Sequence, residues 1–204
     1  MQVAEEMMSE GRPYAALGEL DTLGTRHPEV QLARAQVLAR IGHPDARDNF
    51  EEVRRYQCHR GPAHHGLGLL ALEDGDLDAA GEYLGLARRD LPNVAEVRND
   101  YGFVLLMAGQ EAEAEFELRS ALELSEGGER PLENLLLLYM SRDEVEEMHA
   151  LVRRYGVDEQ MVRRLEARAA RLESARKALR DGVPADLPMD GRAPAPGSAT
   201  REEE

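Results

Sequence analysis

The feature that most constrains this 204-residue chain is an internal repeat with a step of about 34 residues. Six pairs of residues share that spacing and a similar chemical type: Leu67 and Tyr101, Gly68 and Gly102, Gly75 and Gly109, Ala80 and Ala114, Leu84 and Leu118, and Ala87 and Ala121. A unit of this length buries its apolar face only by stacking on its neighbours. The chain is therefore expected to form a linear array of similar units.

The repeated residue types indicate that each unit is a pair of antiparallel helices. Small residues such as Gly68 and Ala80 stand where the two helices would cross, because only small side chains let the backbones approach closely. Gly75 stands where the first helix would end in a left-handed residue, and Pro92 follows the second helix. Together with Leu84 at helical spacing, this is the tetratricopeptide (TPR) pattern.

Weaker copies of the pattern flank the two clear ones. They comprise Gly11, Ala16, Leu20, Leu23 and Pro28 upstream, a shortened unit with Gly42, Ala46, Phe50 and Val53, and Tyr139, Met148, Val152 and Tyr155 downstream. The absence of Trp and the presence of only three Phe also favour closely stacked helices over a sheet. The sequence predicts an all-α TPR superhelical solenoid over residues 1–182, with about four and a half helix pairs.

The C-terminal part is predicted to contain a capping helix and a tail. Residues 158–180 place Met161, Leu165, Ala169, Leu172 and Leu179 on one face, and their arginines mostly elsewhere. A solenoid needs an end with a polar outer face, so this helix is expected to cap the array. Residues 183–204 are rich in Pro, Gly, Ser and Ala and are expected to be a disordered tail.

Charge and composition exclude several classes of partner. The net charge of −15 argues against nucleic acid or an anionic lipid surface, both of which require a cationic footprint. No stretch approaches the roughly 18 apolar residues of a membrane span. Cys58 is the only cysteine, so no disulfide is expected within the chain.

No catalytic, cofactor-binding or metal site is expected, and the chain is not expected to be an enzyme. Cys58, His59, His64 and His65 lie close together in sequence, but their spacing matches no standard zinc pattern. Gly66-Leu-Gly68 lacks the other residues of a phosphate loop and is better explained by close helix packing. Neighbouring acids are better explained as solvated helix faces.

The first helix of each pair is expected to face a concave groove that binds a peptide. The positions on this face are His65, Leu69, Leu72, Asn99, Phe103, Leu106, Asn134, Leu137 and Met140. The core is already supplied by other positions of the same helices, so this second apolar stripe is predicted to be an exposed binding strip. The alternative is that the chain's own tail or internal packing buries the stripe.

Two segments resemble a more specific family. The run from Val97 to Gln110, with its Asn-Asp-Tyr-Gly-Phe core, and the run from Glu133 to Tyr139 look like the TadD family of TPR proteins, which act in tight-adherence (Flp) pilus assembly. The resemblance covers roughly residues 60–180. It implies an outer-membrane lipoprotein on the periplasmic side that acts as a pilotin or assembly factor for the secretin.

One departure from the family concerns the lipid anchor. Cys58 follows Arg-Arg-Tyr-Gln, which is not a lipobox, so any membrane attachment would use an anchor absent from this chain. The partner implied by the resemblance is the secretin or another pilus-assembly subunit. The alternative function is that of a cytoplasmic TPR adaptor or co-chaperone, which differs from the pilotin in its cellular location.

Overall fold

The computed structural model describes residues 2–24 and 26–181 of the chain. The tail predicted at 183–204 lies outside the described residues. Eleven α-helices and one short 3-10 helix account for the regular structure of these ranges. The α-helices are α1 Gln2–Ser9, α2 Pro13–Leu23, α3 Pro28–Arg40, α4 Ala46–Val53, α5 Arg60–Glu73, α6 Leu77–Asp90, α7 Ala95–Met107, α8 Glu111–Leu124, α9 Glu129–Ser141, α10 Val145–Tyr155 and α11 Glu159–Arg180.

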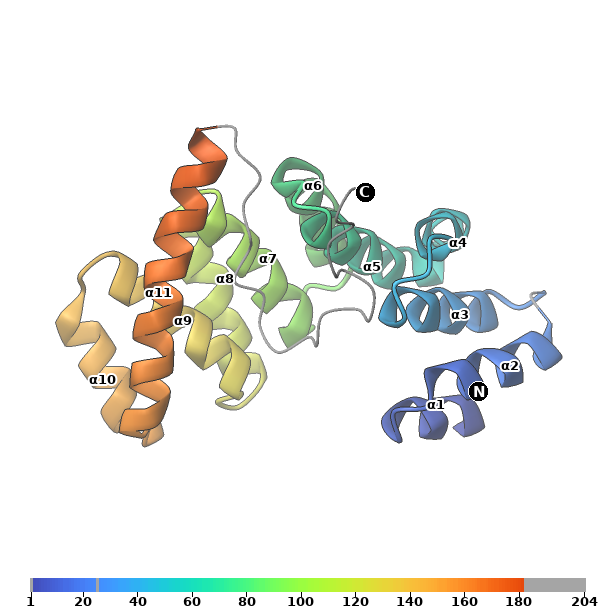
Figure 1. Cartoon of the computed structure of the whole chain (residues 1–204), viewed down its shortest axis with the longest axis horizontal. Helices are drawn as coiled ribbons and strands as arrows, with labels where there is room; N and C mark the ends of the chain where they lie inside the picture. The colour runs from blue at the N-terminus through green and yellow to red at the C-terminus, as the bar shows by residue number, and fades with distance from the viewer. Residues whose placement is uncertain (1, 25, 182–204) are drawn as a thin grey trace, which may run out of the picture.

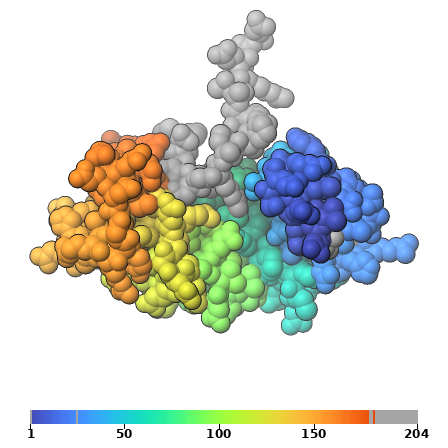
Figure 2. Space-filling model, turned by 90° about the horizontal axis from the view of Figure 1, so that it is seen from below, coloured from blue at the N-terminus to red at the C-terminus, as the bar shows by residue number. Residues whose placement is uncertain are grey.

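The first ten helices form a row of antiparallel pairs, from α1–α2 to α9–α10 (Figure 1). Figure 2 shows that the row is curved, because the first helices and α11 rise on the same side of the middle repeats. The predicted all-α solenoid is thereby confirmed. None of the helices described combines the length and the apolarity that crossing a bilayer requires.

The helix ends follow the repeat predicted from the sequence. Gly75 and Gly109, which end α5 and α7, have φ angles of 78° and 77°. These are left-handed values that glycine adopts without a steric penalty. Directly after Gly75, the Asp76 carboxylate accepts a hydrogen bond of 3.0 Å from the Ala79 amide and caps α6. Turn and cap thus form one compact connection between the two helices.

Each helix pair is held at close approach by a glycine facing a leucine. A Cβ built on Gly68 would lie 2.6 Å from Leu84 Cγ, and one built on Gly102 would lie 2.8 Å from Leu118 Cγ. The contact between α5 and α6 therefore recurs one repeat later, between α7 and α8. The predicted role of these glycines in the helix crossing is confirmed.

The apolar core consists of one large cluster and two smaller ones. The large cluster runs from Ala71 in α5 to Ala175 in α11. The smaller clusters lie in the N-terminal repeats, where the shortened unit buries Phe50 and Val53 as its spacing predicted. Gly66 of α5 leaves room for the Phe50 ring, since a Cβ there would lie 2.3 Å from Phe50 Cζ.

Helix α11 packs against α9 and buries Leu165, Leu172 and Ala175. Asp158 caps its first turn by accepting a 2.7 Å hydrogen bond from the Met161 amide. Two arginines differ from the prediction that placed them away from this face, as the side chains of Arg168 and Arg176 are only 11% and 12% exposed. They lie on the packed side because each reaches an acid of another helix.

Candidate protein-binding surfaces

The concave face does not expose the apolar strip that the sequence predicted. Seven of the nine predicted positions are buried, namely Leu69, Leu72, Asn99, Phe103, Leu106, Asn134 and Leu137, while His65 and Met140 are partly buried. Leu106 and Leu137 have no exposed surface. The prediction that this strip is open was wrong for these positions, and their role in binding a peptide stays a prediction.

Part of the reason is that α11 packs against α9 and adds its own apolar residues to the core there. Phe103, Leu106 and Leu137 belong to the same cluster as Leu165 and Leu172 of α11. The last helix also spans more than one repeat. From α9 it reaches the start of α8, where a 3.0 Å ion pair joins Arg176 to Glu111.

The polar positions of the concave face are joined in a ladder that crosses four helices. His65 Nε2 of α5 lies 2.8 Å from an Asp100 oxygen of α7, and Asn99 donates to the other oxygen at 3.1 Å. Asn134 of α9 donates to Asn99 at 2.9 Å, and Arg168 of α11 donates to Asn134 at 3.4 Å. Three residues predicted to bind a peptide, His65, Asn99 and Asn134, thus form hydrogen bonds between successive repeats instead.

Asp100 is the most deeply buried acid of this ladder. Burial alone would raise the pKa of Asp100, but the hydrogen bond with His65 and the nearby charges of His65 and Arg130 outweigh it, and the pKa is lowered. His65, Glu96 and Asp100 also have donor atoms within 4.8 Å of one another, a spacing that could hold a metal ion. Arg130 approaches both acids, at 4.0 Å from Glu96 and 3.2 Å from Asp100, and supplies positive charge there.

Arg168 closes the ladder at α11. Its guanidinium lies 3.3 Å from Glu133, and burial lowers the pKa of Arg168 to about 10 against the opposing effect of that carboxylate.

The other histidine singled out from the sequence, His64, lies 3.1 Å from Asp90, while Cys58 is exposed in the short 3-10 turn Gln57–His59. The two neighbouring histidines thus contact different acids, His64 with Asp90 and His65 with Asp100.

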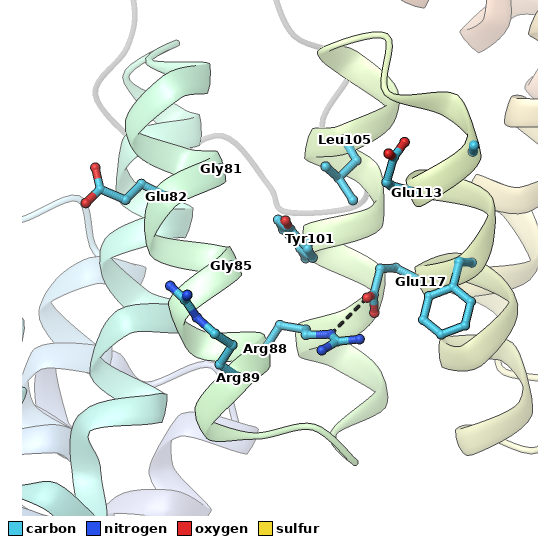
Figure 3. Close-up of a pocket in the computed structure, with 11 residues that line it drawn as sticks. Gly81, Glu82, Gly85, Arg88, Arg89, Tyr101, Leu105, Glu113 and Glu117 are labelled. Carbon is cyan, nitrogen blue, oxygen red and sulfur yellow. Dashed lines mark hydrogen bonds and ion pairs between the residues drawn. The ribbon is translucent and has the colours of Figure 1, made fainter.

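A hollow of about 600 Å³ lies between α6 and α8 over α7 (Figure 3). Its residues are Gly81, Glu82, Gly85, Arg88 and Arg89 of α6, Tyr101 and Leu105 of α7, and Ala112, Glu113, Phe116 and Glu117 of α8. Phe116 forms part of the α8 wall and is 60% exposed, so its ring is accessible to a partner. This volume is within the range of known ligand pockets.

The two ends of the hollow carry different charges. Arg88 lies in the last turn of α6 and its Nε donates to Glu117 at 2.8 Å, drawn as a dashed line in Figure 3. Glu117 also accepts a 2.6 Å hydrogen bond from Arg98 and is 5% exposed, so this triad is a fixed part of the wall. Arg89 lies beside it, whereas Glu113 stands in the first turn of α8.

Comparison with known proteins settles the family of this chain. The TPR repeat-containing protein PA4299 of Pseudomonas aeruginosa is 41% identical to it over 170 residues, which cover 83% of this chain and 69% of the relative. This chain is a TPR protein. No family model matches its sequence.

Two solved TPR structures share the fold. The protein TTC0263 of Thermus thermophilus aligns with a TM-score of 0.59 and 22% identity, covering 85% of this TPR protein and 96% of the other. YrrB, described as a TPR protein with an unusual peptide-binding site, aligns with a TM-score of 0.61 and 20% identity, covering 80% and 88%. Because these identities are low, the likeness concerns the arrangement of the helices.

Sequence reasoning missed the hollow of this TPR protein, although a signal was present. Gly81 and Gly85 are the positions of α6 that correspond to Glu115 and Arg119 of α8, one repeat later. Two glycines inside a helix lower its stability and suggest a packing reason for their presence. The repeat pattern is defined by positions that agree between copies, whereas these glycines stand at positions where the copies differ.

Proposed function

We propose that this TPR protein is a non-enzymatic scaffold that holds a segment of another protein, and that its partner is the secretin or another subunit of a tight-adherence pilus machine. In that role it acts as a pilotin or assembly factor from the periplasmic side of the outer membrane. A cytoplasmic adaptor is the competing function.

The observation that supports protein binding is the open hollow between α6 and α8, with an apolar floor and an exposed Phe116 at its wall. Aromatic side chains are enriched at protein interfaces and often contribute much of the binding energy. The abnormal pKa values described above do not point to catalysis, because each belongs to an ion pair or hydrogen bond that ties two helices together. The role in the pilus is supported by the TadD-like runs at 97–110 and 133–139, which form most of α7 and part of α9.

The experiment is a direct binding measurement with defined components. The purified chain is titrated with the purified soluble domain of the secretin and, separately, with the other soluble pilus-assembly subunits of the source bacterium. A dissociation constant of about 10 μM or lower for one of these subunits, reproduced by co-purification from cell envelopes, supports the proposal. If none of them binds at concentrations up to about 1 mM, the pilus role is refuted.

The cellular location of the protein is tested separately. The product of the full gene is expressed in the source bacterium, and its membranes and cytoplasm are separated and probed with an antibody. Recovery in the outer membrane with a labelled lipid supports the periplasmic scaffold. Recovery in the cytoplasm alone supports the adaptor instead.

A further inference from the structure

We infer that the hollow between α6 and α8 is a docking groove for a short amphipathic helix, which lies antiparallel to α6 with acidic residues in its first turn and basic residues in its last. This inference rests on the proposed function and assigns the partner's segment by its chemistry. It moves the binding site from the concave face, where most of the predicted positions are buried, to the opposite side of α7.

The strongest argument comes from the corresponding grooves of the neighbouring repeats. In the next repeat, Glu115 and Arg119 replace the two glycines and occupy the space themselves. Glu115 accepts hydrogen bonds from Arg142 at 2.8 Å and from Tyr139 at 3.1 Å. Arg119 donates to Glu115 at 2.9 Å and lies 5.7 Å above the centre of the Tyr139 ring. That groove therefore carries a hydrogen-bonded charged pair where the hollow has glycines.

The preceding groove also carries a charged pair at the positions of the two glycines. Arg47 and Glu51 of α4 stand one repeat before Gly81 and Gly85. Glu51 accepts a 3.1 Å hydrogen bond from the Tyr83 hydroxyl, and Arg47 forms a 2.7 Å ion pair with Asp74. Of these three grooves, the middle one alone has glycines where its neighbours have a charged pair.

The glycines leave space directed into the hollow. A Cβ built on Gly85 would lie 3.5 Å from the Tyr101 ring, and one built on Gly81 would lie 3.8 Å from Val104 Cγ1. Both distances are ordinary van der Waals contacts, so the glycines are not required by the packing of α6 on α7. This contrasts with Gly68 and Gly102, which are required by the packing inside each repeat. Small residues on a helix surface allow another backbone to approach closely, which suits an incoming helix.

The charges at the rim define the orientation of that helix. Glu82 and Glu113 stand toward the beginning of α6 and α8, while Arg89 stands in the last turn of α6. Within the part of the chain that the structure describes, none of these three side chains forms a salt bridge. Their charges are available to a partner, and the span from Glu82 to Arg89 is about 10 Å of helix.

An ordinary helix carries acids in its first turn and bases in its last, because these complement its macrodipole. Since α6 and α8 are second helices of successive repeats, they run in the same direction. A partner helix that runs antiparallel to them places its acidic first turn beside Arg89 and its basic last turn beside Glu82 and Glu113. Its apolar face then contacts Tyr101, Leu105 and Phe116 over about three turns, or roughly 11 residues.

The probe for this inference is a synthetic helical peptide of about 12 residues, or roughly three turns, that carries two Glu in the first turn, Leu and Phe at helical spacing, and two Arg in the last turn. A second peptide has the Glu and Arg exchanged. Binding to the full chain is followed by fluorescence anisotropy. The first peptide is expected to bind about fivefold more tightly than the second at low salt, since exposed ion pairs contribute little each, and salt should reduce the difference.

Three variants of the chain test the site. Gly85→Leu fills the hollow and Phe116→Ala removes part of its wall, so each should weaken binding about tenfold or more. Gly18→Leu is the matched control, because Gly18 is a helical glycine with nothing within 4 Å of a Cβ. The double variant Arg89→Glu with Glu113→Arg should reverse the preference and bind the exchanged peptide more tightly.

The outcomes separate this inference from the proposed function. Equal affinity for the two peptides, no binding of either at about 1 mM, or unchanged binding to Gly85→Leu overturns the docking groove. If Gly85→Leu still captures the pilus subunit that the parent captures, the scaffold function stands and the site lies elsewhere. If the parent captures no pilus subunit but discriminates the peptides, the groove stands and the pilus role is refuted.

Discussion

Adding one methyl group to helical glycines should have opposite effects at different positions of this solenoid. Gly102→Ala places a Cβ 2.8 Å from Leu118 Cγ and 3.3 Å from the Leu118 backbone nitrogen. Real Cβ atoms do not approach other atoms that closely, so α7 and α8 must separate. Gly18→Ala in α2 meets nothing within 4 Å and replaces glycine by the best helix former.

The magnitudes follow from two opposing contributions to the free energy of unfolding. Replacing an internal helical glycine by alanine stabilises a helix by roughly 0.5 to 1 kcal/mol. Overpacking a close contact costs about 1 to 3 kcal/mol. Gly102→Ala is therefore expected to lower the free energy of unfolding by about 1 to 2 kcal/mol, and Gly18→Ala to raise it by about 0.5 to 1 kcal/mol.

The assay is urea denaturation followed by the helical circular-dichroism signal. Gly68→Ala should behave like Gly102→Ala, because its Cβ would lie 2.6 Å from Leu84 Cγ. Combining Gly102→Ala with Leu118→Ala should give less than the sum of the two single effects, since the clash needs the leucine. If Gly102→Ala stabilises the protein as Gly18→Ala does, the close crossing of α7 and α8 is refuted.

Three further results are expected. Phe103→Glu combined with Leu106→Glu should abolish the cooperative thermal unfolding seen in the helical circular-dichroism signal, since both side chains lie in the core. A double variant that still folds would show that the concave face opens. A chain ending at residue 158 should melt at lower temperature and bind more of an apolar dye than one ending at Asp181, because the core beneath α11 is uncovered; equal melts would contradict the cap. Burial lowers the pKa of His64 below its ordinary 6.5, so the unfolded state takes up the proton first, and the free energy of unfolding should fall as pH drops below about 6.5. Urea denaturation at pH 7.5 and 5.5 should show a smaller fall for His64→Gln, and an equal fall would exclude His64 as the cause.

The sequence predicted the solenoid because the repeat encodes contacts between residues that are close along the chain. Gly68 meets Leu84 within one repeat, and the same contact returns with Gly102 and Leu118. Glycine at a helix end and small residues at a crossing depend on local geometry, which the residue types largely determine. The helix pairs, the buried Phe50 of the shortened unit and the last helix could therefore be predicted from spacing.

The sequence could not decide which side of the array stays open, because that depends on where α11 folds back. Its apolar face was visible in the sequence, but its path along the concave side brings Leu165 and Leu172 into one core with Phe103 and Leu137. Most of the positions predicted for the concave stripe are buried. The hollow beside Phe116 likewise arises from the distance between α6 and α8, which is set by stacking across repeats. Local patterns determine the helices and their pairing, whereas exposure is a property of the whole assembled array.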